Sequence, residues 1–132
     1  MDIIRFEYSG PYNYNNQIAG TNRLEDISDR SLKKGICAIT PGWIIFELND
    51  EWEISEIEIG GFAGNNSLWA PENGAGATIL TSLDKSNWAT VGSVPSGFGT
   101  TIKTVKLTKS VARYLKFTCT NYLGIGYFSI KQ

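Results

Sequence analysis

Residues 41–59, PGWIIFELNDEWEISEIEI, decide the fold class, because apolar and polar residues alternate along most of this stretch. Side chains of a β-strand point to opposite faces in turn, so Ile44, Phe46 and Leu48 share one face of an extended segment. The Asn-Asp pair at residues 49–50 is typical of a turn and predicts the end of this strand.

The second part of the stretch repeats the alternation. Ile57 and Ile59 face one way while Glu56 and Glu58 face the other, which is the pattern of a strand with one buried and one solvated face. Similar runs, bounded by turn residues, are found at residues 3–8, 76–94, 101–109, 112–120 and 127–132. The run at 76–94 reads as two strands around a turn at residues 84–87.

The rest of the chain reads as loops. Residues 9–35 are polar and rich in Asn, Gly and Asp, which predicts a loop with one short helical turn near residues 24–27. About eight short strands and no amphipathic helix predict an all-β, antiparallel sandwich or barrel. A length of 132 residues fits a single domain, residues 1–132.

Composition excludes several partners. The net charge is -1 and no run of like charge is visible, which argues against nucleic acid and anionic membrane surfaces. No stretch approaches eighteen apolar residues, so we expect no membrane span. The N-terminus lacks the pattern of a signal peptide. We therefore expect a cytoplasmic protein, one whose export signal was removed, or one released as part of a particle.

The chain has no histidine, which removes much chemistry. A Ser-His-Asp or Cys-His catalytic apparatus is excluded, and so are His-ligated metals. Paired carboxylates remain, such as those at residues 51/53 and 56/58, but acids two apart on a strand are typical of a solvated face. Cys37 and Cys119 allow one bridge at most, and the sequence favours free thiols.

Three motifs together resemble the discoidin, or coagulation factor C-type, family. Residues 41–59 are similar to that family's Trp-containing strand, with Glu-Leu-Asn at 47–49 in place of Asp-Leu-Gly. TSLDKSNW, residues 81–88, resembles its Ser-x-Asp-Gly-x-x-Trp hairpin, with Lys in place of Gly. ARYLKF, residues 112–117, resembles its Ala-Arg-Tyr-Ile-Arg-Phe strand. The resemblance implies a galactose-binding-like jelly roll.

The resemblance also raises the question of a structural calcium ion. Carbohydrate-binding members of the family often hold calcium between an early Asp-containing loop and a Glu near the C-terminus. Asp26 and Asp29 could supply the early ligands, but the tail FSIKQ has no Glu, and calcium needs six to eight oxygens. The alternative role for both aspartates is capping and turn formation.

The four tryptophans divide into groups. The resemblance and the local alternation both place Trp43 and Trp88 in the core, and Trp52 is expected to cover a sheet edge. Trp69 lies in the irregular stretch SLWAPENGAGA, which no periodicity explains. Its ring is expected to stack on a sugar, and the alternatives are a plug at the end of the sandwich or a protein contact.

The candidate ligand site consists of loop residues at one end of the sandwich, where loops carry recognition while the sheets hold them in place. A planar ring and amide or carboxylate partners suit a neutral glycan. The candidate ligand-binding residues are Tyr12, Tyr14, Arg23, Asn65, Asn66, Trp69, Glu72, Asn73, Phe98, Asn121 and Tyr122.

Two functions fit these sequence features. The leading hypothesis is a non-catalytic, lectin-like module that binds a glycan or glycoconjugate through its end loops, with gain from multivalency. The alternative is a protein-docking or structural component of a larger assembly, such as a phage or virion decoration, a tail protein or an intracellular adaptor. We do not expect an enzyme.

Overall fold

A computed structural model describes residues 2–64 and 68–131, and within these ranges the chain forms strands and one short helix. Asn65 and Asn66, two of the candidate ligand-binding residues, lie outside the described residues. The elements are β1 (Ile3–Tyr8), β2 (Asn13–Tyr14), β3 (Gln17–Ile18), the 3-10 helix η1 (Leu24–Ser28), β4 (Ile36–Ala38), β5 (Trp43–Gly60), β6 (Thr78–Ser82), β7 (Ala89–Ser93), β8 (Lys103–Thr118), β9 (Leu123–Ile125) and β10 (Tyr127–Ile130).

The strands form one main sheet and two small ones. The main sheet has the order β1-β5-β8-β6-β7, and β10 also pairs with β5; β2 pairs with β3, and β4 with β9. All of these pairs are antiparallel. The predicted all-β, antiparallel class is confirmed, and η1 confirms the expected helical turn. That residues 1–132 form a single domain stays a prediction.

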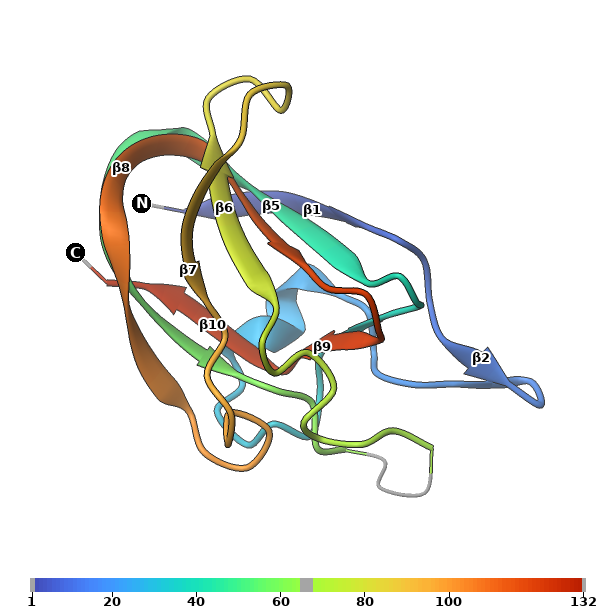
Figure 1. Cartoon of the computed structure of the whole chain (residues 1–132). Helices are drawn as coiled ribbons and strands as arrows, with labels where there is room; N and C mark the ends of the chain where they lie inside the picture. Colours follow the sequence, from blue (N-terminus) through green and yellow to red (C-terminus); the bar gives the residue numbers. More distant parts are fainter. Residues whose placement is uncertain (1, 65–67, 132) are drawn as a thin grey trace.

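The two longest strands, β5 and β8, are the centre of the fold. They lie side by side and curve together at the left edge of the molecule in Figure 1. The turn predicted at residues 49–50 is wrong, because these residues lie within β5, which is one continuous strand of 18 residues. Likewise, the strands predicted at 101–109 and 112–120 are one strand, β8. The register between β5 and β8 shifts near these points, as it does at a β-bulge. The residue types of a bulge resemble those of a turn, which explains why the sequence predicted turns here.

The same register shifts explain why both halves of β5 face one core. Ile44, Phe46 and Leu48 occupy even positions, whereas Ile57 and Ile59 occupy odd ones, yet all five are fully buried in one cluster. A strand alternates with a period of two, so its phase must change once between these sets. The pairing with β8 shifts twice, between residues 47 and 52 and between residues 54 and 56. From the Glu47–Tyr114 pair to the Glu56–Lys106 pair, β5 advances nine residues and β8 eight, and this one-residue difference supplies the change.

Two of the three scaffold tryptophans differ from the expectation. Trp43 and Trp88 are half-buried and lie on the outer face of the sheet, outside the core cluster. The ammonium group of Lys116 lies 5.9 Å from the centroid of the Trp43 ring and 5.3 Å from that of the Trp88 ring. Trp52 does cover a sheet edge as expected, half-buried and donating its indole N–H to Asn49 Oδ1 at 3.0 Å.

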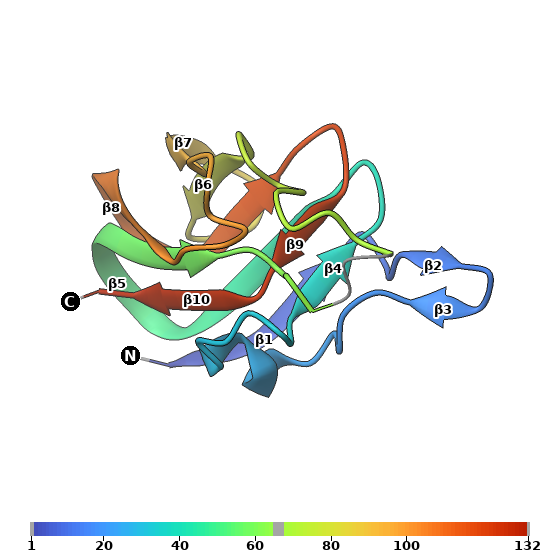
Figure 2. The ribbon, with the colours of Figure 1, turned by 90° about the horizontal axis from the view of Figure 1, so that it is seen from below.

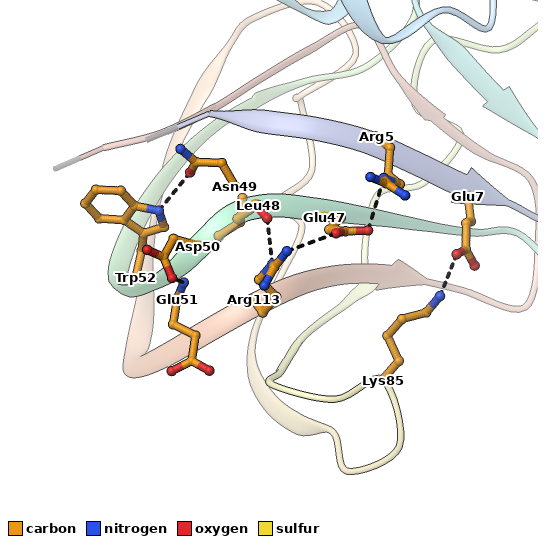
Figure 3. A network of polar contacts seen from close by, with 10 residues as sticks. All are labelled: Arg5, Glu7, Glu47, Leu48, Asn49, Asp50, Glu51, Trp52, Lys85 and Arg113. Carbon is orange, nitrogen blue, oxygen red and sulfur yellow. Dashed lines mark hydrogen bonds and ion pairs between the residues drawn. The ribbon is translucent and has the colours of Figure 1, made fainter.

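Polar side chains on β1, β5 and β8 form a network (Figure 3). The carboxylate of Glu47 contacts both Arg5 and Arg113, each at 3.3 Å, and Arg113 also donates to the backbone carbonyl of Leu48. Glu7 pairs with Lys85 from the loop between β6 and β7. These contacts occupy the carboxylates on this part of the sheet.

Both cysteines are free, as the sequence favoured, and Cys37 is buried, which raises the pKa of its thiol. Within the described ranges, no helix has the length and apolar character needed to cross a membrane.

The hairpin of β6 and β7 forms where it was predicted, and its turn depends on the carboxylate of Asp84. Asp84 Oδ1 accepts the backbone N–H groups of Ser86 and Asn87 at 2.8 and 2.9 Å, and Ser82 donates its hydroxyl to the same oxygen. These donors, the Asn87 N–H first, hold the pKa of Asp84 well below its ordinary value. The ionised carboxylate therefore stabilises the fold.

We expect Asp84→Asn to lower the melting temperature at pH 7, with the difference from the wild type shrinking at low pH. Since folding lowers this pKa, the contribution is complete above the unfolded value of about 4 and is lost as pH falls through the folded value. Thermal unfolding of both proteins between pH 7 and pH 2 measures the difference. A difference that stays constant over this range would contradict the role of the charge.

Candidate functional site

A groove of about 340 Å³ lies at one end of the sandwich, between the segment that precedes β6 and the segment that follows β8. These segments lie on the side of the molecule away from the two chain ends (Figure 1). The groove is lined by Glu72, Asn73, Gly74, Ala75, Gly76, Thr78, Thr118, Cys119, Thr120, Asn121 and Tyr122. Four of these residues, Glu72, Asn73, Asn121 and Tyr122, are candidates from the sequence.

Backbone contacts fix the two walls of the groove. The Asn73 carbonyl accepts the N–H of Gly124 at 3.0 Å, which ties one wall to the start of β9. The Asn121 carbonyl accepts the N–H of Gly42 at 2.7 Å. A Cβ at Gly42 would lie 2.7 Å from Leu123 Cβ and 2.9 Å from the Asn121 carbonyl oxygen, so only glycine permits this approach. The loop walls are therefore held by the strands beneath them.

An aromatic cluster supports the ring of Tyr122. Its ring centroid lies 5.0 Å from that of Tyr12 and 5.9 Å from that of Trp69, both in edge-to-face arrangements. Tyr12 and Trp69 are themselves 5.7 Å apart. Such T-shaped contacts contribute about 0.5–1.5 kcal/mol each beyond the area they bury. Tyr122 is half-buried and is the aromatic residue of the groove lining.

The expected role of Trp69 needs correction. Its side chain is only 2% exposed, so its ring has no free face for a sugar. It packs with Ala19, Cys37 and Phe62 in a second hydrophobic cluster, which is the position of an end plug. The ring can pack here because residue 124 is a glycine: a Cβ at this position would lie only 2.8 Å from the indole nitrogen of Trp69. The large ring is buried because it is enclosed by segments that lie far from residue 69 in the sequence, including β4.

Glu72 also has a different role from the one expected. One carboxylate oxygen accepts the N–H of Gly97 and the other accepts the N–H of Gly99, each at 2.6 Å. The carboxylate therefore ties the groove wall to the loop of residues 96–101 and is occupied by the protein itself. Phe98, between the two glycines, is fully buried and cannot contact a ligand as predicted.

The remaining candidates lie apart from the groove. Tyr14 is 58% exposed on the β2–β3 hairpin, which projects from the body of the molecule in Figure 2. Arg23 precedes η1 and pairs with Asp26 at 3.1 Å and with Glu25 at 3.8 Å. Neither residue lines the groove.

The aspartates proposed for calcium are bound by other groups of the protein. Asp26 is buried and is bound by the Arg23 guanidinium; a hydrogen bond from Thr21, then that from Arg23, lowers its pKa. Asp29 Oδ1 accepts the backbone N–H of Ser31 at 2.9 Å, the main cause of its lowered pKa. Among the described residues, no group of three or more His, Cys, Asp or Glu side chains could hold a metal. Turn formation, the alternative from the sequence, describes both residues.

The sequence did not identify the threonines of the groove. Thr78 and Thr118 are direct partners across β6 and β8, so their side chains lie on the same outer face of the sheet. The alternation of each strand places them outside, but only the pairing of the two strands brings them together. That pairing is not visible in the sequence.

A larger hollow of about 510 Å³ lies between η1 and the strands β1 and β10. Its lining combines Phe128 and four aliphatic residues with two carboxylates and two serines, and it contains no amide side chain: Asp2, Ile3, Leu24, Glu25, Ile27, Ser28, Phe128, Ser129 and Ile130. The groove combines a half-buried tyrosine with hydroxyl and amide groups, which is the chemistry of a selective ligand site. We therefore take the groove as the candidate site.

Solved structures with the same fold include carbohydrate-binding modules. A pectin-binding module is 22% identical, with a TM-score of 0.73 over 99% of this chain and 91% of that one. The CBM32 of AlyQ, in complex with 4,5-unsaturated mannuronic acid, is 19% identical, with a TM-score of 0.72 over 99% and 96%. Chitosan-binding module 2 from a Paenibacillus sp. IK-5 chitosanase/glucanase, in complex with chitotriose, is 18% identical, with a TM-score of 0.69 over 97% and 95%.

These likenesses confirm the expected fold. The chain has the discoidin-like, galactose-binding-like jelly roll of the CBM32 modules. No known protein-family profile matches the sequence, and no curated protein matches it.

We expect Glu72→Gln to loosen the loop of residues 96–101. A carboxamide can accept one of the two N–H groups but not both, so one charge-assisted pair is lost, at a cost of about 1–2 kcal/mol. Hydrogen exchange at Gly97 and Gly99 measures the opening, and urea unfolding measures the stability. Glu51→Gln, an exposed change on β5, is the control. Equal exchange in both variants would contradict the role assigned to Glu72.

Proposed function

We propose that this protein is a non-catalytic carbohydrate-binding module that holds a neutral sugar in the groove beside Tyr122. The observation that carries the proposal is the braced half-buried tyrosine in a groove lined by amides and hydroxyls. A hexose has one apolar face, which packs on an aromatic ring, and hydroxyl groups around its edge, which need hydrogen-bond partners.

The polar groups of the groove suit such a ligand. The carboxamide of Asn73 can both donate and accept, as adjacent sugar hydroxyls require. In Asn121, Oδ1 accepts the backbone N–H of Tyr122 at 2.9 Å, which orients the side chain and leaves its NH₂ group as a donor. Thr78 and Thr118 add hydroxyl groups at the other end.

The charges of the groove support binding rather than hydrolysis. Glycosidases use two carboxyl groups about 5–9.5 Å apart across the scissile bond. Glu72 is the acidic residue of the groove lining, and its two oxygens are held by backbone N–H groups. With this carboxylate occupied, the groove offers neutral hydrogen-bond partners.

The structural neighbours support the same class of ligand. The proteins named above are described by their binding to pectin, a mannuronic acid derivative and chitotriose. Some neighbours are parts of larger chains with an alginate lyase or an M60 catalytic domain. By analogy, this chain would deliver an attached or associated activity to a glycan, with weak single-site affinity strengthened by multivalency.

The test is a glycan-array screen followed by calorimetry on wild type, Tyr122→Ala and Asn73→Ala. We expect each substitution to weaken binding at least tenfold, because one removes the stacking surface and the other a bidentate partner. Tyr14→Ala is the matched control, since Tyr14 is an exposed tyrosine outside the groove. Circular dichroism confirms that each variant is folded.

Either of two results would overturn the proposal. Binding that survives both groove substitutions would place the glycan elsewhere. Absence of glycan binding by the wild type would leave the assembly alternative, which stays a prediction, as the remaining hypothesis.

A further inference from the structure

We propose that the ligand-binding surface continues from the groove onto the outer face of the main sheet, where Lys116, between Trp43 and Trp88, binds an acidic sugar unit of a longer chain. This inference rests on the proposed function of the groove. It adds a substrate class, uronate-containing oligosaccharides, to a groove whose lining contains no basic residue.

Strand register makes the two surfaces continuous. Thr118, which lines the groove, is the direct partner of Thr78 on one side and of Trp43 on the other. Directly opposed residues in an antiparallel pair point to the same face, so these three side chains form one row across β5, β8 and β6. Trp43 therefore shares a row with two residues of the groove lining, Thr78 and Thr118.

Lys116 lies in the next row. It is two residues from Thr118 along β8, about 7 Å at the rise of a strand. Its partners across the sheet are Ile45 and Leu80, which carry no charge. A glycan that leaves the groove past Thr118 reaches Lys116 with its next unit.

The ammonium group of Lys116 is held but not neutralised. The Trp43 and Trp88 rings lie 5.9 and 5.3 Å from it, and Trp88 is fixed by a hydrogen bond from its indole nitrogen to the Lys85 carbonyl. Cation–π contacts stabilise a cation without using up its capacity to pair with an anion. Among the described residues, no carboxylate forms an ion pair with Lys116.

The carboxylates that share this face are already occupied. Glu7 lies in the same row as Lys116, as the partner of Ile45, but it pairs with Lys85. Glu47, one row further, is held by two arginines (Figure 3). A half-buried lysine between two aromatic rings thus lacks an anion, and a sugar carboxylate supplies one together with an apolar face for the rings.

The test compares two tetrasaccharides that differ only in charge class, an oligogalacturonate and a neutral β-galactan, by calorimetry at 50 mM NaCl. We expect Lys116→Gln to weaken oligogalacturonate binding five- to tenfold and to leave galactan binding within twofold. Lys116→Arg keeps the cation and should retain most of the affinity. Lys106→Gln, an exposed lysine on the other half of β8, controls for net charge.

A second measurement uses ligand length. Galactose as a monosaccharide occupies the groove alone, so its binding should not depend on Lys116. The preference for the acidic tetrasaccharide should also fall as NaCl is raised to 500 mM, because salt screens the pair.

The outcomes separate this inference from the proposed function. Galactan binding that depends on Tyr122, with no effect of Lys116→Gln on oligogalacturonate, would leave the groove assignment standing and overturn the sheet-face extension. Equal losses in Lys116→Gln and Lys106→Gln would also overturn it, as a general charge effect. Failure of the wild type to bind oligogalacturonate, while it binds a neutral glycan through Tyr122, would overturn this inference alone.

Discussion

The antiparallel pairing of β5 with β8 is the constraint on which the rest of the molecule depends. Because the period of a strand is two, this register decides which residues enter the core and which face outward. It sends Ile44 and Phe117, which are partners, into the core, and Ile45 and Lys116 to the outer face. The same register ends β8 at Thr118, where the groove begins.

The groove depends on a second constraint, the burial of a large ring that belongs to an irregular loop. Trp69 packs against the rings of Tyr12 and Tyr122 and so helps to hold Tyr122 in place. A substitution of Trp69 would therefore affect the fold of the end loops and the site together. For this reason, substitutions of Tyr122 and Asn73 test the site more cleanly than substitutions of Trp69.

The sequence predicted the fold class better than the site. Alternation correctly placed Ile57 and Ile59 inside, because a two-residue period is local information. It predicted a turn in β5 because the residues of a bulge and a turn are the same types, and only the partner strand distinguishes them. The motif resemblance supplied the jelly roll, which no local pattern could have done.

Among the candidate residues, Asn73 and Tyr122 do line the groove, and their role in ligand binding stays a prediction. The expectation was wrong where packing by distant segments decides exposure, as for Trp69 and Phe98, which composition places in loops and the tertiary structure buries. The sequence did not point to the threonine row or to the proposed role of Lys116, because both depend on cross-strand register and not on the residues that surround them in the chain.

The most direct test of a glycan site in the groove is the protection of Cys119 from a maleimide by the bound glycan. Cys119 is half-buried in the groove lining, whereas Cys37 is fully buried and serves as the unreactive internal reference. We predict that a saturating glycan slows labelling of Cys119 in the native protein. Glycan binding that leaves the labelling rate unchanged would contradict the groove site, because the ligand would then lie outside it.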